Sequence, residues 1–319
     1  MTKPRRVLVT GASGYIGSLV VANLADDNEH IAKLVATDIR PTPRAERKQD
    51  VVYRVFDVRE SGLAEILLEH EIDTVVHLAA IVSPGKNSDP ELEYSVDVDG
   101  TRNTLEACVQ AGVSQIIVTS SGAAYGYHAD NRALLTEDCP LRGNDEFPYS
   151  RHKRLVEQML AEYRRDYPEL GQLVFRPGTI LGPTANNQIT NLFSKPVVLG
   201  INGSATPFVF IWDQDVVGCI ALGVRTGRTG IYNLAGDGVM TLHEIADRLH
   251  KRYVSLPPAL ISGSLAMLSR LGVSRYGPEQ VRFLQYRPVL DNQALKRDFG
   301  YTPQCTSRQV FEMYAEARA

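Results

Sequence analysis

The sequence predicts an α/β protein in which a doubly wound parallel sheet is followed by a smaller C-terminal α/β domain. Short runs rich in Val, Ile and Leu alternate with helical patterns over the first two-thirds of the 319 residues, as expected of a parallel sheet covered by helices on both faces. The first run leads directly into a glycine-rich turn and a helix. After Arg176 the alternation stops, and Gly, Pro and Asn become frequent. A chain of this length can hold one large and one small domain.

The apolar patterns also give the order of the elements. Runs with strand character lie at residues 6–10, 33–38, 51–56, 74–78, 115–119 and 172–175. Helical spacing of apolar residues occurs at 15–24, 63–70, 91–111 and 149–167. Residues 241–250 predict a further helix, because Thr241 fits the N-cap and Glu244 completes a capping box. The last predicted helix covers residues 307–317.

Composition and charge exclude several classes of protein. The net charge is -3 and no Lys/Arg block is present, so we expect no nucleic-acid partner; the basic run 40–48 is interrupted by prolines and predicts a solvated loop. The four cysteines form no C-x-x-C pair, which predicts no metal site and a reducing compartment. The longest apolar candidate, 256–273, contains prolines and an arginine, so we expect no stable membrane insertion. Without a signal peptide, these features favour a cytoplasmic protein with a small-molecule substrate.

The glycine-rich turn predicts a dinucleotide site. Gly11, Gly14 and Gly17 form G-x-x-G-x-x-G between a strand and a helix. The first glycine permits a tight turn, the second lets the backbone approach a pyrophosphate, and the third lets the helix pack closely. The helix N-terminus then offers N–H groups to the anion. Asp38, at the end of the second strand, fits a carboxylate that accepts from the ribose hydroxyls and repels a 2′-phosphate, so the pattern favours NAD over NADP. Nearby arginines, at positions 40 and 44, would favour NADP if they were not simply solvated.

Two other strand ends offer contacts to the cofactor. Asp57 and Val58 follow the third strand, where a carboxylate and an amide could meet an adenine amino group; a carboxylate that caps the next helix fits equally well. Leu78, Ala79 and Ala80 end the fourth strand with mostly small side chains, which would let a cofactor lie against the backbone or serve close packing.

A possible catalytic set lies at the fifth strand and the helix that follows. Tyr149 and Lys153 are four apart, hence on one helical face. An ammonium group one turn from a phenol favours the phenolate, which can exchange a proton with a substrate oxygen. This spacing is common by chance. However, Ser121 stands at the carboxyl end of the fifth strand, where ligands bind in such sheets, and its hydroxyl could polarise a substrate carbonyl.

Together these motifs resemble the extended branch of the short-chain dehydrogenase/reductase superfamily, which includes the NAD-dependent epimerase/dehydratase family. The resemblance covers nearly the whole chain. Its matching residues are Gly11, Gly14, Gly17, Asp38, Asp57, His77–Ala80, Gly100-Thr101, Ser121, Tyr125-Gly126, Tyr149, Lys153, Arg176-Pro177, Gly182-Pro183, Asp215-Val216, Tyr232-Asn233 and the ending Asp298–Pro303.

The resemblance implies a Rossmann domain for NAD at residues 1–178 plus about 208–234, and a substrate domain at 179–207 and 235–319. It implies Tyr149 as acid/base, Lys153 as its modulator and ribose ligand, and Ser121 as the polarising hydroxyl, with hydride passing between nicotinamide C4 and a substrate carbon. A homodimer through helices 91–111 and 149–167 is expected. The implied cofactor contacts are Gly11, Ser13, Gly14, Tyr15, Ile16, Gly17, Asp38, Ile39, Arg40, Asp57, Val58, Leu78, Ala79, Ala80, Thr119, Tyr149, Lys153, Arg176, Pro177, Gly178 and Thr179. The implied substrate contacts are Val82, Ser83, Gly122, Ala123 and Tyr149.

Departures from the family pattern bear on the substrate. Sugar-nucleotide epimerases usually show Asn where this chain has Asp97, Asn where it has Thr179, and an Arg near the apolar stretch 206–210. The acidic pair typical of dehydratases is replaced by Gly122-Ala123, which argues against dehydration as the reaction.

Three functions remain open from the sequence. The main expectation is an alcohol dehydrogenase or ketone reductase acting on a secondary alcohol or ketone of moderately apolar character, with Pro207, Phe208, Phe210 and Trp212 near its pocket. The alternative is an NAD-dependent 4-epimerase of the UDP-sugar type, in which Arg287 and Lys195 could serve the diphosphate. A cofactor-binding regulatory protein without turnover is disfavoured by the intact catalytic set.

Overall fold

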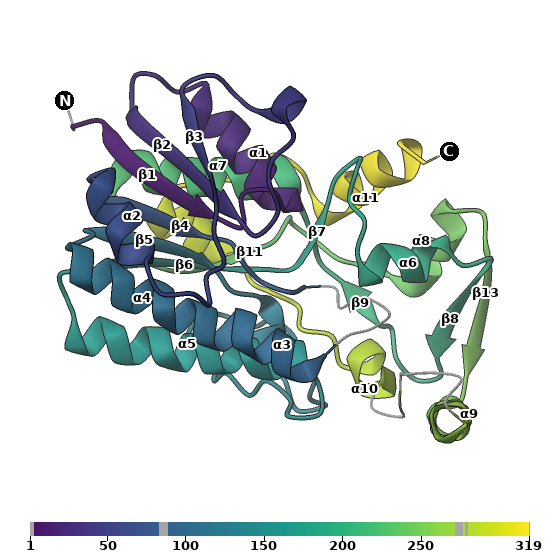
Figure 1. Cartoon of the computed structure of the whole chain (residues 1–319). Coiled ribbons are helices and arrows are strands. Elements are labelled where there is room, and N and C mark those ends of the chain that lie inside the picture. Colours follow the sequence, from purple (N-terminus) through teal and green to yellow (C-terminus); the bar gives the residue numbers. More distant parts are fainter. Residues whose placement is uncertain (1–2, 83–88, 272–276, 278–279, 319) are drawn as a thin grey trace. The chain divides into compact units, whose positions relative to one another are not determined.

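The computed structural model describes residues 3–82, 89–271, 277 and 280–318 (Figure 1). It divides into two compact units. Unit 1 consists of Met1–Ser121, His152–Arg176 and Asp213–Tyr232, and unit 2 of Gly122–Arg151, Pro177–Trp212 and Asn233–Ala319. These units are defined by packing, whereas the predicted domains are defined by the ligand each would bind, so the cofactor and substrate domains stay predictions.

A seven-stranded sheet organises the first part of the chain. Its order is β11-β6-β5-β4-β1-β2-β3, and the pairings from β6 to β3 are all parallel. The order reverses at β1 and β4, the switch point whose carboxyl ends bind ligands in doubly wound sheets. The predicted fold class is confirmed. The strands are β1 Arg5–Thr10, β2 Ile31–Asp38, β3 Val51–Val55, β4 Thr74–His77, β5 Gln115–Thr119, β6 Gly171–Pro177 and β11 Gly230–Leu234.

Helices cover the sheet (Figure 1). Side chains of α2, α4 and α5 share one apolar core with β1, β4, β5 and β6, built around residues such as Leu67, Leu105, Leu160 and Ile116. Helices α1 and α7 pack against each other. The helices concerned are α1 Tyr15–Ala25, α2 Leu63–Glu69, α3 Pro90–Tyr94, α4 Gly100–Ala111, α5 Pro148–Asp166 and α7 Asp213–Thr226, with the short 3-10 turn η1 Arg44–Glu46 in the basic loop.

The predicted helix 91–111 is not uniform. A π-helical segment, η2 Ser95–Asp99, separates α3 from α4. Two threonine hydroxyls donate to carbonyls four residues earlier: Thr101 to Asp97 at 2.6 Å and Thr104 to Gly100 at 2.8 Å. Such bonds disturb regular helical geometry, and π segments are frequent at functional sites. Apolar spacing alone does not reveal a single widened turn.

Unit 2 contains short strand pairs and helices. The predicted capping box at Thr241 is confirmed: its side chain accepts from the Glu244 amide, and the Glu244 side chain accepts in return. The strand pairs are β7 Thr179–Leu181 with β10 Phe210–Trp212, β9 Pro207–Phe208 with β12 Met240–Thr241, and β8 Val197–Ile201 with β13 Arg252–Leu256. The helices are α6 Gln188–Ser194, α8 Leu242–Arg248, α9 Pro258–Arg270, α10 Gln280–Gln285 and α11 Ser307–Glu316, with the short helical segments η3 Gly122–Tyr125 and η4 Leu295–Phe299.

Aromatic side chains form the centre of unit 2. The rings of Phe193, Phe208, Phe210 and Phe311 lie 5.5–6.2 Å apart, and all four are fully buried. Phe208 and Phe210, which the sequence predicts near a substrate pocket, therefore pack in the core of unit 2.

Within the described residues, no helix is long and apolar enough to cross a bilayer, although part of the candidate stretch 256–273 lies outside them. No cluster of potential metal ligands occurs in the same part of the chain.

Candidate active site

The glycine-rich turn has the geometry that its sequence predicts. Gly11 has φ +67°, and a Cβ there would lie 2.7 Å from the amide nitrogen of Ala79. A Cβ on Gly17 would lie 2.0 Å from the Gly11 carbonyl oxygen, so α1 can approach the turn only with glycine at that position. Gly14 is the N-cap of α1 and supplies no side-chain cap. The first turn of α1 therefore fits an anion such as a pyrophosphate.

Asp38 lies directly beside this turn. Its carboxylate accepts from the backbone amides of Ser13, at 3.0 Å, and Arg40, at 2.9 Å. The Arg40 guanidinium donates to the Ser13 carbonyl at 3.1 Å, and its Nε stands 3.6 Å from Asp38. Neighbouring Ile39 is mostly exposed. These contacts hold an anionic side chain next to the phosphate-binding turn, where the ribose of NAD would lie.

The side chain of Tyr15 points elsewhere: its hydroxyl donates to Asp213 at 2.5 Å. The predicted cofactor contacts of Tyr15 and Ile16 stay predictions.

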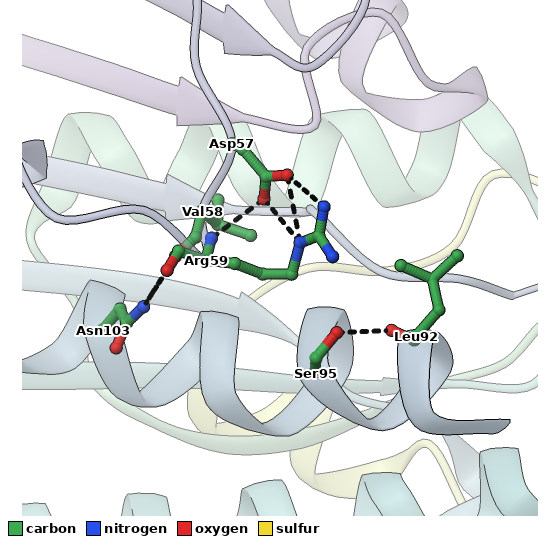
Figure 2. A network of polar contacts seen from close by, with 6 residues as sticks. All are labelled: Asp57, Val58, Arg59, Leu92, Ser95 and Asn103. Atoms are coloured by element: carbon green, nitrogen blue, oxygen red, sulfur yellow. Dashed lines mark hydrogen bonds and ion pairs between the residues drawn. The ribbon is translucent and has the colours of Figure 1, made fainter. Parts of the chain in front are cut away.

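Asp57 is engaged by its own neighbour (Figure 2). Its carboxylate accepts from the Arg59 amide at 2.9 Å and from the Arg59 guanidinium at 2.5–3.0 Å. These hydrogen bonds from Arg59 lower the pKa of Asp57. The following carbonyl, of Val58, accepts from Asn103 of α4 at 3.2 Å. Since the N-cap of α2 is Gly62, Asp57 does not cap that helix, and of its two interpretations only the adenine contact stays a prediction.

The segment after β4 is tied to the sheet by its amides. Leu78 and Ala79 donate to the Thr10 hydroxyl at 3.2 and 3.3 Å, and Ile81 donates to Asp97 at 2.8 Å. The predicted contact Val82 is largely exposed, whereas Ser83 lies outside the described residues. Leu78–Ala80 thus lie on a fixed backbone beside Gly11.

Lys153 and the end of β5 meet in unit 1. The buried Lys153 donates its ammonium to the Thr119 carbonyl at 3.1 Å. Burial lowers the pKa of Lys153, while the carboxylates of Asp97 and Glu157 oppose this shift. The Thr119 hydroxyl is buried with no hydrogen-bond partner among the described residues. A buried hydroxyl without a partner is costly, so this strand end fits a ligand that bonds to it. Ser121 follows two residues later and is 9% exposed.

Arg176 has a structural partner. Its guanidinium donates to both carboxylate oxygens of Glu157, at 2.8 and 2.6 Å, and Ser120 donates to the same carboxylate at 2.6 Å. All three side chains are buried. The predicted contacts of Arg176 with a cofactor stay a prediction.

In unit 2, Tyr149 belongs to the first turn of α5. Its ring packs against a cluster of Ala123, Tyr127 and Phe147, to which Phe283 also contributes. The next residue fixes this arrangement, because Ser150 donates to the Ala123 carbonyl at 2.6 Å and accepts from the Asn144 amide at 3.1 Å. Four residues along α5, one helical turn, separate Tyr149 from Lys153.

Arg287 extends the same cluster. Its guanidinium lies over the rings of Phe208, at 4.1 Å, and Phe283, at 4.8 Å. Nη2 donates to the Thr179 hydroxyl at 3.2 Å, while Nη1 is buried with no hydrogen-bond partner among the described residues. Burial lowers the pKa of Arg287 to about 10, so it remains a cation at neutral pH. The sequence named Arg287 only as an alternative: Phe283 lies four residues away, but Phe208 and Thr179 are distant in the chain.

The backbone on either side of Thr179 is closely packed. A Cβ on Gly178 would lie 2.9 Å from the Val209 side chain, and the Gly178 amide donates to Leu234 at 2.9 Å. The predicted cofactor contacts of Pro177, Gly178 and Thr179 stay predictions.

Comparison with known proteins identifies the family. Residues 7–234 match the model of the NAD dependent epimerase/dehydratase family. The chain belongs to this NAD-dependent family, as the resemblance implied, and NAD as its cofactor is confirmed at that level.

Individual relatives are more distant. An uncharacterized protein of Mycobacterium tuberculosis (strain ATCC 25618 / H37Rv) is 24% identical over 318 residues, 99% of this chain and 84% of the relative. A UDP-glucose 4-epimerase of Erwinia amylovora is 32% identical over 190 residues, 57% of this chain and 56% of that enzyme. Among solved structures, a UDP-glucose 4-epimerase of Thermus thermophilus in complex with NAD has a TM-score of 0.75 at 24% identity, covering 98% of both chains. This structural similarity shows the fold.

Proposed function

We propose that the protein is an NAD-dependent epimerase that inverts a hydroxyl-bearing carbon of a nucleoside diphosphate sugar. The sequence favoured an alcohol dehydrogenase or ketone reductase and kept the epimerase as the alternative. The family and the UDP-glucose 4-epimerase relatives support the alternative better. The single observation that carries the proposal within the structure is the environment of Arg287.

Arg287 fits the diphosphate of such a substrate. Its guanidinium is enclosed by two rings, has one buried nitrogen without an acceptor, and is in ion-pair contact with no carboxylate in the described part of the chain. A buried cation of this kind is stabilised by an anion, and guanidinium binds phosphate oxygens in a geometrically matched way. The neighbouring Thr179 hydroxyl offers a second group to the same anion.

The support for an apolar substrate is correspondingly weaker. Phe208 and Phe210, which suggested an apolar pocket, are both 0% exposed in the aromatic core of unit 2. Phe208 also faces the Arg287 cation. An aromatic ring in this position helps to hold a charged group, which suits a charged substrate.

The chain's own residues supply the proton chemistry. When bound, NAD would supply a reversible hydride acceptor at its nicotinamide ring, which takes a hydride from the sugar carbon and returns it to the same carbon, so that no net oxidation occurs. Tyr149 takes the proton of the substrate hydroxyl and returns it to the oxygen after the sugar has turned, so epimerisation needs a reversible acid/base. The Lys153 ammonium favours the phenolate form of Tyr149. Ser121 donates to the substrate oxygen.

The proposal is tested with UDP-glucose, followed by NMR for interconversion with UDP-galactose in the presence of NAD. We expect Arg287→Ala to raise KM for the UDP-sugar about 10- to 100-fold, as for loss of a charge-assisted contact, with unchanged affinity for NAD. Arg252→Ala is the matched control, because Arg252 is an exposed arginine at the start of β13 in the same unit. If the protein instead reduces simple ketones with stoichiometric consumption of NADH and interconverts no UDP-sugar, the epimerase proposal is wrong and the dehydrogenase hypothesis is supported.

We further propose that the protein is a homodimer through the outer faces of α4 and α5, as the resemblance implies. Light scattering coupled to size exclusion measures the mass directly, and a monomer at micromolar concentration would contradict this.

A further inference from the structure

A buried hydrogen bond between a carboxylate and an imidazole, Asp97 and His152, joins η2 to α5 directly before Lys153. The Asp97 carboxylate and the Nδ1 atom of His152 are 3.1 Å apart, and the two side chains are 1% and 2% exposed. The His152 ring also meets Tyr94 edge-on, with centroids 5.5 Å apart. An ionised carboxylate has only acceptors, so Nδ1 of His152 carries the hydrogen. This pair stands where the sequence departs from the Asn of related epimerases.

Asp97 also holds the backbone that would face the cofactor. Its second carboxylate oxygen accepts from the Ile81 amide at 2.8 Å. Ile81 follows directly on the predicted cofactor contacts Leu78–Ala80. One carboxylate therefore links the segment after β4 to α5, the helix that carries Lys153.

A second chain of hydrogen bonds reaches Asp97 from the glycine-rich turn. Thr101 donates to the Asp97 carbonyl at 2.6 Å, so its oxygen must accept from Nε2 of His77, at 3.1 Å. Burial lowers the pKa of His77 to about 3, and a neutral ring that donates from Nε2 accepts at Nδ1. Thr10 then donates to Nδ1 at 2.9 Å and is free to accept the amides of Leu78 and Ala79. In this series of hydrogen bonds, the donor and acceptor roles of Thr101, His77 and Thr10 are therefore mutually consistent.

The charged groups around Lys153 affect how strongly its ammonium form is favoured. The carboxylates of Asp97 and Glu157 favour its ammonium form. Glu157 is already neutralised by its bidentate ion pair with Arg176, and His77 is neutral. Asp97, by contrast, is hydrogen-bonded to the ring of His152 and the amide of Ile81. Asp97 is thus the anion whose removal would change the charge balance at Lys153 most.

We infer that Asp97 and His152 are positioning residues of the cofactor site, which fix the amide of Ile81 and keep the neighbouring Lys153 in its ammonium form. This inference rests on the role of Lys153 in the proposed function. It does not depend on the sugar nucleotide.

The test is the affinity for NAD, measured by isothermal titration calorimetry between pH 6 and pH 10. Asp97→Asn keeps the shape and an acceptor for Ile81 but removes the charge. We expect NAD affinity to fall as Lys153 loses its proton, and this fall to move about one pH unit lower in Asp97→Asn, with near-normal affinity at pH 6. At pH values between the alkaline falls of the two proteins, Asp97→Asn should bind NAD about 10-fold more weakly than the unmodified protein, because the fall moves by about one pH unit.

Two controls separate the possible failures. Asp73→Asn removes another carboxylate of unit 1 that accepts a backbone amide, that of Arg6 at 3.0 Å, but at the opposite end of β4; its profile should match the unmodified protein. Lys153→Met should abolish the alkaline fall, and a fall that persists would overturn the role of Lys153 and with it this inference. If Asp97→Asn weakens binding equally at every pH, or not at all, Asp97 is only structural and the inference is wrong, whereas the epimerase proposal is untouched.

Discussion

At the scale of single residues, the described chemistry depends on a few side chains whose surroundings restrict what they can do. Tyr149 is held by an aromatic cluster and lies one helical turn from an ammonium group. Lys153 is buried against a backbone carbonyl. Such groups are fixed before a substrate arrives, which is the condition for efficient proton transfer.

Replacing Tyr149 by Phe should lower kcat about 10²- to 10⁴-fold, the usual contribution of a general acid/base, because the ring is kept and the proton carrier is lost. NAD affinity should change little. Steady-state kinetics with UDP-glucose and calorimetry with NAD measure the two effects separately. Near-normal turnover in this variant would exclude Tyr149 as the acid/base.

Asp38 should determine the choice of cofactor. Its carboxylate is held beside the glycine-rich turn by two amides, where it would repel a 2′-phosphate. We expect Asp38→Ala to lower the preference for NAD over NADP about tenfold or more, since the adjacent Arg40 would then attract the phosphate. The ratio of the two dissociation constants gives the answer. An unchanged ratio would assign the preference to other contacts.

At the scale of elements, the predicted phosphate site depends on the close approach of α1 to the turn before it. A Cβ at position 17 would lie 2.0 Å from a carbonyl oxygen of the turn, a distance that backbone atoms can relieve only by moving. The helix start and the turn are therefore one unit in function.

Gly17→Ala should displace α1 and weaken NAD binding by about 100-fold, with loss of stability of roughly 1–3 kcal/mol from overpacking. Gly263→Ala is the matched control, because a Cβ there meets nothing within 4 Å in α9, and alanine favours a helix. The melting temperature and the NAD titration should both distinguish them. Equal behaviour of the two variants would contradict the close approach.

The π-helical segment η2 is the second element of interest, because it carries Asp97, which is hydrogen-bonded to His152 of α5. Replacing His152 by Phe removes the hydrogen-bond donor and keeps a ring beside Tyr94. We expect a loss of about 3 kcal/mol in the free energy of unfolding, because a buried carboxylate loses its partner. Urea denaturation at neutral pH measures it. A loss below about 1 kcal/mol would mean that Asp97 finds another partner.

At the scale of the whole molecule, stability should depend on pH through His77. Its pKa is lowered by burial to about 3, from 6.5, so the unfolded chain binds a proton more readily. The contribution of His77 to the free energy of unfolding is fully present above pH 6.5. It falls as the pH drops toward 3, by about 1.4 kcal/mol per pH unit. His70 has its pKa lowered by burial as well and acts in the same direction. Urea denaturation between pH 7 and pH 4 should therefore show a shallower dependence in His77→Gln than in the unmodified protein, and parallel curves would exclude His77 as the source.

The local features of this protein were determined by its sequence. Strands β1 to β6, the three glycines, Asp38 and the Tyr149–Lys153 spacing were predicted, because alternation, turn chemistry and helical periodicity depend on neighbouring residues. Strand β11 and the short strands of unit 2 were not predicted. The family followed from these motifs in their order. The preferred function did not: an apolar stretch at 206–210 indicated an apolar substrate, whereas its phenylalanines form a core.

Only the tertiary structure decided what distant residues do to each other. Arg287 meets Thr179 across 108 positions and lies over two rings from separate elements. Asp97 meets His152 across 55 positions, and a single widened turn in a helix directs it there. Apolar periodicity indicates which face of a helix is buried. It does not indicate which polar groups become neighbours when that face packs. Local pattern therefore predicted the fold and the Tyr149–Lys153 spacing, whereas long-range packing determined the surroundings of Arg287 and the buried pair beside Lys153.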